Sequence, residues 1–333
     1  MKIEKILGCM IGLACGDALG VPVEFKSREA IYEEFGVIEN MVGGGTWGKP
    51  AGTVSDDTEM ALCVAEGIIE NPKDPVPSIG ERFVRWYENE PFDVGVCCSI
   101  VIARMLGKKS KKADWFRESK RYAAESNGRC CGNGGLMRTA YVGVFYNNLK
   151  DVKCNAYDIC KMTHNNIDVC DDCSMVSTII HELIEGGTKE TIESIVLGDK
   201  RSDVYDLGDI EGYPFMVKPT GYSVNSLKCA LKCVLTTRSF KDAVVMAVNM
   251  GGDTDTIGAI TGAIAGALYG VEGIPEEWIN ALDDDAFDRI IHVSMMGAVN
   301  RMGGYENVVS RIREWNKEEV QTGNEGSDGC GYE

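Results

Sequence analysis

The sequence has few basic residues and only three histidines. Its 34 lysines and arginines stand against 51 acidic residues, which leaves a formal net charge of −17. A field of this sign repels phosphate backbones and anionic bilayers, so we expect neither nucleic acid as a general ligand nor a membrane as a partner. A small phosphate-bearing ligand remains compatible, because backbone N–H groups or metal ions can neutralise it locally.

The sequence also lacks the alternating apolar and polar pattern of β-strands. Apolar residues recur instead at helical spacing, i, i+3, i+4 and i+7. The stretches with this pattern are 58–70, 99–107, 173–186, 225–236, 240–250 and 287–302. We therefore predict an all-α fold with one compact domain over residues 1–316. Residues 317–333 end in a polar, glycine-rich stretch that predicts a disordered tail.

We expect no apolar run of the ~20 residues that cross a bilayer. The N-terminus imitates a signal peptide, but Glu4 and repeated glycines in its apolar part favour a first core helix without export. The fourteen cysteines are scattered along apolar stretches, as buried thiols are, rather than arranged as a disulfide framework. These features indicate a cytoplasmic protein.

One group of cysteines leaves a zinc site open as an alternative. Cys160, His164, Cys170 and Cys173 are residue types that bind zinc. Structural zinc sites usually show two tight ligand pairs, whereas one pair is loose here. Buried structural thiols are the simpler interpretation.

Two acidic clusters stand far apart in the chain, each just before an apolar helical stretch. They read SDDT at 55–58 and DTDT at 253–256. A helix cap requires only one such residue, and adjacent carboxylates repel unless a cation lies between them. Oxygen ligands without histidine or cysteine suit a hard ion such as Mg²⁺ or Mn²⁺. The sequence therefore favours metal binding over caps with solvated charge.

The stretch after the second cluster, 257–270, is rich in glycine and alanine. Interior glycines cost a helix about 1 kcal/mol each relative to alanine, but they let a neighbouring helix approach closely. We interpret this stretch as a packing helix that mounts the acidic cluster rigidly.

Several single residues are candidates for chemistry. Glu24 lies between two apolar residues, which suits a general acid or base, although an edge-of-core residue with its tip in water is the simpler alternative. The glycine-rich turn 128–138 has a form that can hold phosphate, and Arg138 either pairs with phosphate or forms a structural ion pair. Neither a nucleophile elbow nor a paired Ser/Cys–His motif is present, which excludes that mode of catalysis.

Taken in order, seven motifs resemble the ADP-ribosylglycohydrolase family. They are GDALGVPVEF (16–25), PAGTVSDDTEMAL (50–62), PFDVG (91–95), GNGGLMR (132–138), TH (163–164), GYSVNSLKCAL (221–231) and AVNMGGDTDTIGAITGAIAGALYG (247–270). The chain departs from the family pattern at Ser55, where threonine is commoner, and at Cys97 and Cys98, where threonines are usual. Ser55 preserves the hydroxyl group.

The resemblance implies a compact helical fold with two Mg²⁺ ions, for which Mn²⁺ substitutes, at the base of a cleft. The implied metal ligands are Ser55, Asp56, Asp57, Asp253, Asp255 and Thr256. The implied catalytic residues are Glu24, Asp56, Asp57 and Asp93. The residues implied to contact ADP-ribose are Gly95, Asn133, Gly134, His164 and Tyr222.

The activity that the resemblance implies is hydrolysis of the bond between ADP-ribose and a modified acceptor, such as an arginine or serine side chain. The expected partner is an ADP-ribosylated protein or a small ADP-ribosyl compound, and the expected state is a monomer. The alternatives are hydrolysis of a related ADP-ribosyl or glycosyl metabolite and a non-catalytic ADP-ribose-binding paralogue. Loss of metal ligands would mark the latter, and this sequence retains all of them.

Overall fold

The computed structural model describes residues 2–205 and 218–325 of the chain. The helices are α1 (Lys2–Gly20), α2 (Arg28–Phe35), α3 (Asp56–Glu70), α4 (Pro75–Glu88), α5 (Val96–Ala103), α6 (Lys112–Glu125), α7 (Ala140–Phe145), α8 (Leu149–Lys161), α9 (Ile167–Ile184), α10 (Lys189–Leu197), α11 (Ser202–Tyr205), α12 (Ser223–Thr236), α13 (Phe240–Val248), α14 (Thr254–Tyr269), α15 (Glu276–Ile279), α16 (Asp284–Met302) and α17 (Tyr305–Glu325). Short 3₁₀ turns lie at Val21–Val23, Asn133–Gly135 and Val271–Gly273. Within the described ranges, extended pairing is limited to isolated bridges, so the all-α prediction is confirmed.

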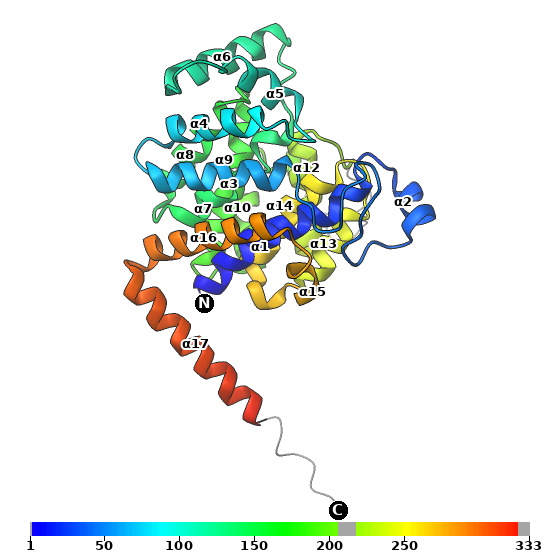
Figure 1. Ribbon diagram of the computed structural model, residues 1–333, viewed down its shortest axis with the longest axis vertical. Coiled ribbons are helices and arrows are strands. Elements are labelled where there is room, and N and C mark those ends of the chain that lie inside the picture. The colour runs from blue at the N-terminus through cyan, green and yellow to red at the C-terminus, as the bar shows by residue number, and fades with distance from the viewer. Residues whose placement is uncertain (1, 206–217, 326–333) are drawn as a thin grey trace, which may run out of the picture.

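Helices α1 and α14 run antiparallel through the centre of the bundle, and the other helices pack around them (Figure 1). Three pairs of glycines bring the two backbones together: Gly8 with Gly266, Gly12 with Gly262, and Gly16 with Gly258. A Cβ atom built on Gly262 would lie 1.9 Å from the Gly12 carbonyl oxygen. No residue with a side chain fits at that distance, so the glycine spacing in both helices sets their separation.

The end of this contact carries functional residues. A Cβ at Gly20 would lie 2.5 Å from the backbone of Asp255, and the Thr254 hydroxyl donates to the Gly20 carbonyl at 2.8 Å. Asp17 lies one turn back along α1. The last turn of α1 and the first turn of α14 therefore hold two carboxylates side by side.

The apolar stretch that includes α1 is longer than the sequence analysis expects. By length and composition Lys2–Val23 is a candidate membrane span, so the expectation that no apolar run reaches that length was wrong. In the most apolar 18 residues of this stretch, 94% of the residues are buried inside the protein. Its apolar side chains already have protein neighbours, as in the core helix that the sequence predicts.

Helix α17 extends away from the helical body (Figure 1). It continues to Glu325, so its backbone is helical well into the segment 317–333 for which the sequence predicts disorder. The remainder of that segment, 326–333, lies outside the described residues. A domain boundary at residue 316 stays a prediction.

We predict that Gly262→Ala lowers the free energy of unfolding. Overpacking costs about 1–3 kcal/mol, and a clash with rigid backbone belongs at the upper end, above the roughly 1 kcal/mol that alanine gains in helix propensity. Denaturant unfolding measures the change. The control is Gly198→Ala, whose added Cβ would approach no atom closer than 3.1 Å. Equal stability of the two variants would contradict the close contact of α1 with α14.

Candidate active site

Asp17 fastens α3 to α1 at the base of the site. Its carboxylate is fully buried. It accepts hydrogen bonds from the Ser55 hydroxyl at 2.8 Å, the Thr58 hydroxyl at 2.6 Å and the backbone N–H groups of both residues. Burial raises the pKa of Asp17 from 3.8 to about 6, although these hydrogen bonds oppose the shift. The sequence analysis missed this residue. Its signal was a single carboxylate inside an otherwise apolar helical stretch.

Asp17, Asp57 and Asp255 form the deeper of two carboxylate groups, with ligand atoms within 4.8 Å of one another. The Thr256 and Ser55 hydroxyls reach Asp57 Oδ2 at 3.2 and 3.3 Å. The other oxygen, Asp57 Oδ1, is buried without a hydrogen-bond partner. Burial raises the pKa of Asp57 and of Asp255 well above 3.8, and neighbouring carboxylates add to the effect. An unsatisfied oxygen among crowded carboxylates fits a bound cation.

Glu24, Asp93 and Asp255 form the second group, so Asp255 belongs to both. The Trp47 indole donates to Glu24 Oε2 at 2.6 Å. Burial and the nearby Asp93 raise the pKa of Glu24 to about 8, so this carboxyl group can hold a proton at neutral pH. The turn that aims Glu24 includes Phe25, a non-glycine residue at a φ of 63°, in a sterically costly region. The sequence analysis did not assign Trp47 a role.

Asp56 and Asp253 line the same cavity as Glu24 and Asp93, but they belong to neither carboxylate group. Asp56 Oδ2 accepts from the Gly95 N–H at 3.2 Å, which ties the loop 91–95 to the start of α3. Burial raises the pKa of Asp56 well above 3.8, and Asp93 adds to the effect. Asp253 Oδ2 accepts from the Asn133 amide at 2.8 Å. These two carboxylates therefore also position the surrounding loops.

The cavity above the carboxylates has a volume of about 400 Å³. Gly95, Asn133, Gly134 and His164 line it, as do Cys97 and Cys98. The Asn133 side-chain nitrogen donates hydrogen bonds to both Asp253 and Ser226 Oγ. It therefore connects these residues within the site. Tyr222 lies outside this lining. It borders an adjoining hollow of about 430 Å³ that shares Arg129, Gly132 and Gly221 with the main cavity.

The zinc alternative finds no support. The Cys160 and Cys170 thiols both point to the backbone carbonyl of His164, at 3.7 Å. The His164 ring lies against the Gly132–Gly135 turn. In residues 2–205 and 218–325, the groups that bring three ligand atoms together are the two carboxylate groups above.

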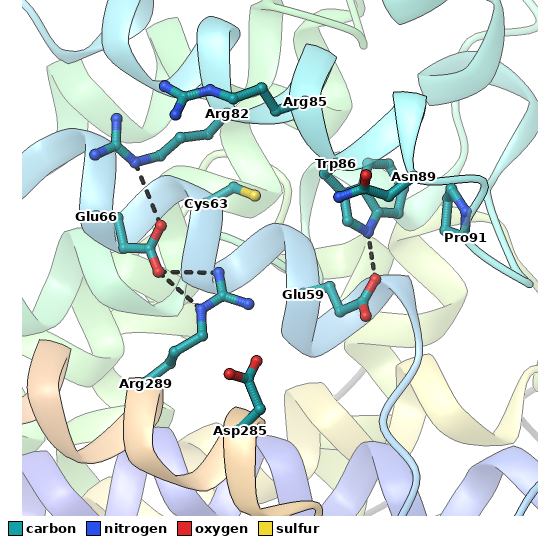
Figure 2. Close-up of a pocket in the computed structure, with 10 residues that line it drawn as sticks. All are labelled: Glu59, Cys63, Glu66, Arg82, Arg85, Trp86, Asn89, Pro91, Asp285 and Arg289. Atoms are coloured by element: carbon teal, nitrogen blue, oxygen red, sulfur yellow. Dashed lines mark hydrogen bonds and ion pairs between the residues drawn. The ribbon is translucent and has the colours of Figure 1, made fainter.

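A second cavity of about 420 Å³ lies between α3, α4 and α16 (Figure 2). Half of its charged side chains form ion pairs with one another. Glu66 pairs with Arg82 and Arg289, and Glu59 accepts from the Trp86 indole. Figure 2 shows these partners turned toward one another across the hollow. No described carboxylates crowd together there as they do around Asp255, so we place the chemistry at the first cavity.

The fold and the site together define an all-α protein with a cavity lined by carboxylates, which belong to or adjoin two crowded carboxylate groups suited to hold cations. The chain belongs to the ADP-ribosylglycohydrolase family, whose model matches residues 1–307. The resemblance seen in the sequence is therefore confirmed. The chain is a hydrolase of this family, which is metal-dependent.

Named relatives span most of the chain. An ADP-ribosylarginine hydrolase of Pseudomonas putida is 29% identical, over 89% of this chain and 81% of its own length. The ADP-ribosyl-[dinitrogen reductase] glycohydrolase of Rhodospirillum rubrum is 32% identical, over 84% of this chain and 90% of its own length. A solved structure described as an ADP-ribosylglycohydrolase-related protein complex is 28% identical and matches with a TM-score of 0.73. That match covers 89% of this chain and 99% of the solved chain.

We predict that the metal-free protein loses stability as pH rises from 4.5 to about 8.5. The folded-state pKa values of Asp17 and Glu24 are raised to about 6 and about 8. Protonation of these two carboxyl groups therefore stabilises the fold in full below their unfolded-state pKa values. This stabilisation is lost as pH rises through their folded-state pKa values. Thermal unfolding in EDTA measures the slope, and added Mg²⁺ should restore stability at high pH.

Asp255→Asn should flatten this slope, because it removes the carboxylate that both groups share. The control is Asp242→Asn, an exposed carboxylate outside both groups. Stability that rises with pH in EDTA would show that the buried carboxylates do not repel one another.

Proposed function

We propose that this protein hydrolyses the N-glycosidic bond between ADP-ribose and an arginine side chain of a modified protein, in a reaction that depends on two Mg²⁺ ions. The observation that carries the proposal is the pair of carboxylate groups that share Asp255, of which Glu24 and Asp93 line the cavity. Two relatives support the substrate, since one is named for ADP-ribosylarginine and the other for ADP-ribosylated dinitrogen reductase.

The residues that would hold the ions are the carboxylates of both groups other than Glu24, with Asp56, Asp253 and the hydroxyls of Ser55 and Thr256 around them. Divalent ions such as Mg²⁺ or Mn²⁺ supply positive charge that orients sugar hydroxyls and acidifies a water molecule. The Ser55 hydroxyl is shared with Asp17 and Asp57, so a threonine is not required for this bonding.

Glu24 is the group that moves a proton. Its Oε2 accepts from Trp47, which leaves Oε1 as the oxygen that carries the proton. A carboxyl group with a pKa near neutrality is well matched to general acid catalysis. In our proposal Glu24 Oε1 gives its proton to the leaving nitrogen of the arginine side chain as the C–N bond breaks and the oxygen of a water molecule bonds to the sugar carbon. The proton that this water releases passes to the Glu24 carboxylate, which restores the acid.

The loops on either side position the substrate. The Gly95 N–H is held by Asp56, and Asn133 is held by Asp253 and Ser226. The glycines at 132 and 134 leave backbone rather than side chains facing the cavity, where phosphate groups can approach closely.

We also propose a monomer that acts in the cytoplasm. The thirteen cysteines that the structure describes are all free thiols, which suits a reducing compartment.

We predict that a peptide carrying ADP-ribosylated arginine releases ADP-ribose in Mg²⁺ and not in EDTA, because crowded carboxylates without ions cannot orient the sugar. A peptide carrying ADP-ribosylated serine should react more slowly. Chromatographic detection of free ADP-ribose measures both rates. Faster release from the serine peptide would reassign the acceptor.

The matched variant for this assay is Glu24→Gln, which keeps the acceptor oxygen for Trp47 and removes the proton donor. We expect kcat to fall by roughly 10²–10⁴-fold, the usual contribution of general acid–base catalysis. Activity close to that of the wild-type protein would show that another group moves the proton.

A further inference from the structure

Arg138 is fully buried, and its guanidinium group has no carboxylate partner among the residues that the structure describes. Both sequence interpretations of Arg138, a phosphate ligand or a member of an ion pair, differ from what is observed. Its Nη2 donates to the Thr163 hydroxyl at 2.8 Å, and its Nη1 lies 3.4 Å from the Cys98 sulfur. The guanidinium carbon lies 4.7 Å from the centre of the Phe83 ring.

This arrangement is costly for the fold. Arginine keeps its charge in proteins, and a buried charge loses its hydration without the attraction of an opposite charge to offset it. Nε has no hydrogen-bond partner at all. A residue held under these conditions requires an explanation beyond packing, and the contacts of Thr163 provide one.

Thr163 connects Arg138 to the cavity. The Thr163 oxygen accepts from Arg138 and lies 2.8 Å from His164 Nδ1. A hydroxyl group has one proton to donate, and Nδ1 is its one strong acceptor among the described contacts. The hydroxyl therefore donates to Nδ1. A neutral imidazole that accepts at Nδ1 carries its hydrogen on Nε2.

His164 presents that second nitrogen to the glycine turn that lines the cavity. The ring is 2% exposed, and Cβ atoms built on Gly132 and Gly134 would lie 3.5 and 3.6 Å from Nε2. Burial, with the charge of Arg138, lowers the pKa of His164 to about 3, so the ring is neutral at physiological pH. Its Nε2–H has no acceptor among the described residues.

We propose that Arg138 is a positioning residue that acts through Thr163 to hold His164 in its Nε2-protonated form, so that the imidazole donates a hydrogen bond to a phosphate oxygen of ADP-ribose. The identity of the ligand rests on the proposed function, whereas the tautomer rests on the structure alone.

The first test reads the tautomer in the substrate-free protein. Long-range ¹H–¹⁵N NMR distinguishes the two neutral forms of an imidazole, and His164→Gln identifies the signals among those of the three histidines. We expect wild-type His164 to carry its proton on Nε2. Thr163→Val removes the hydroxyl and should leave a mixture of tautomers. A wild-type protein with the proton on Nδ1 would overturn the proposal.

The second test measures the affinity for ADP-ribose in Mg²⁺ by calorimetry. Thr163→Val should weaken binding about tenfold, the loss expected for one hydrogen bond to a charged oxygen. The substrate KM should rise while kcat changes little. Thr178→Val is the control, because the Thr178 hydroxyl is similarly buried and bonds only within its own helix, to Ser174 O. Unchanged affinity in Thr163→Val would overturn the role of His164 as a donor.

Arg138→Met, checked for folding by circular dichroism, separates the arginine from the threonine. We expect the same mixture of tautomers and weaker binding. A folded variant that keeps the wild-type NMR pattern and affinity would overturn the role of Arg138. If the wild-type protein does not bind ADP-ribose, the proposed function and the phosphate contact both fail, and the NMR result alone then decides the tautomer.

Discussion

The close contact between α1 and α14 is the constraint on which the rest of the site depends. Six interior glycines cost about 1 kcal/mol each in helix propensity, and they bring two backbones closer than any side chain allows. Because the helices are antiparallel, the end of α1 meets the start of α14 at this contact. Asp17 and Asp255 come together for that reason, and Asp17 then binds the first turn of α3, which carries Asp57.

The α1–α14 contact holds like-charged carboxylates close together in the site, although they repel one another. Burial and mutual repulsion raise the pKa values of Glu24, Asp57 and Asp255, so the carboxylates require protons or cations. Arg138 is buried beside Cys98, which lines the same cavity, and it has no carboxylate partner among the described residues.

The fold class and the two acidic clusters could be predicted from sequence because helical periodicity and runs of carboxylates are local signals. Asp17 and Trp47 were missed because their roles arise from partners far along the chain, namely Ser55, Thr58 and Glu24. The sequence predicts a disordered tail from residue 317 because this segment ends in a polar, glycine-rich stretch. The α17 backbone continues to Glu325, and the state of the residues beyond it stays a prediction. The sequence also could not show that Arg138 has uncharged partners, because a buried arginine without an ion pair produces no recognisable sequence motif.

The most direct test of the central claim is the stoichiometry of Mn²⁺ binding, measured by calorimetry on metal-free protein with wild-type Asp255 and with Asp255→Asn. We predict two ions for each wild-type chain. The substitution should weaken both, because Asp255 belongs to both carboxylate groups at the end of the α1–α14 contact. Absence of binding to the wild-type chain, or unchanged binding of two ions after the substitution, would contradict the account.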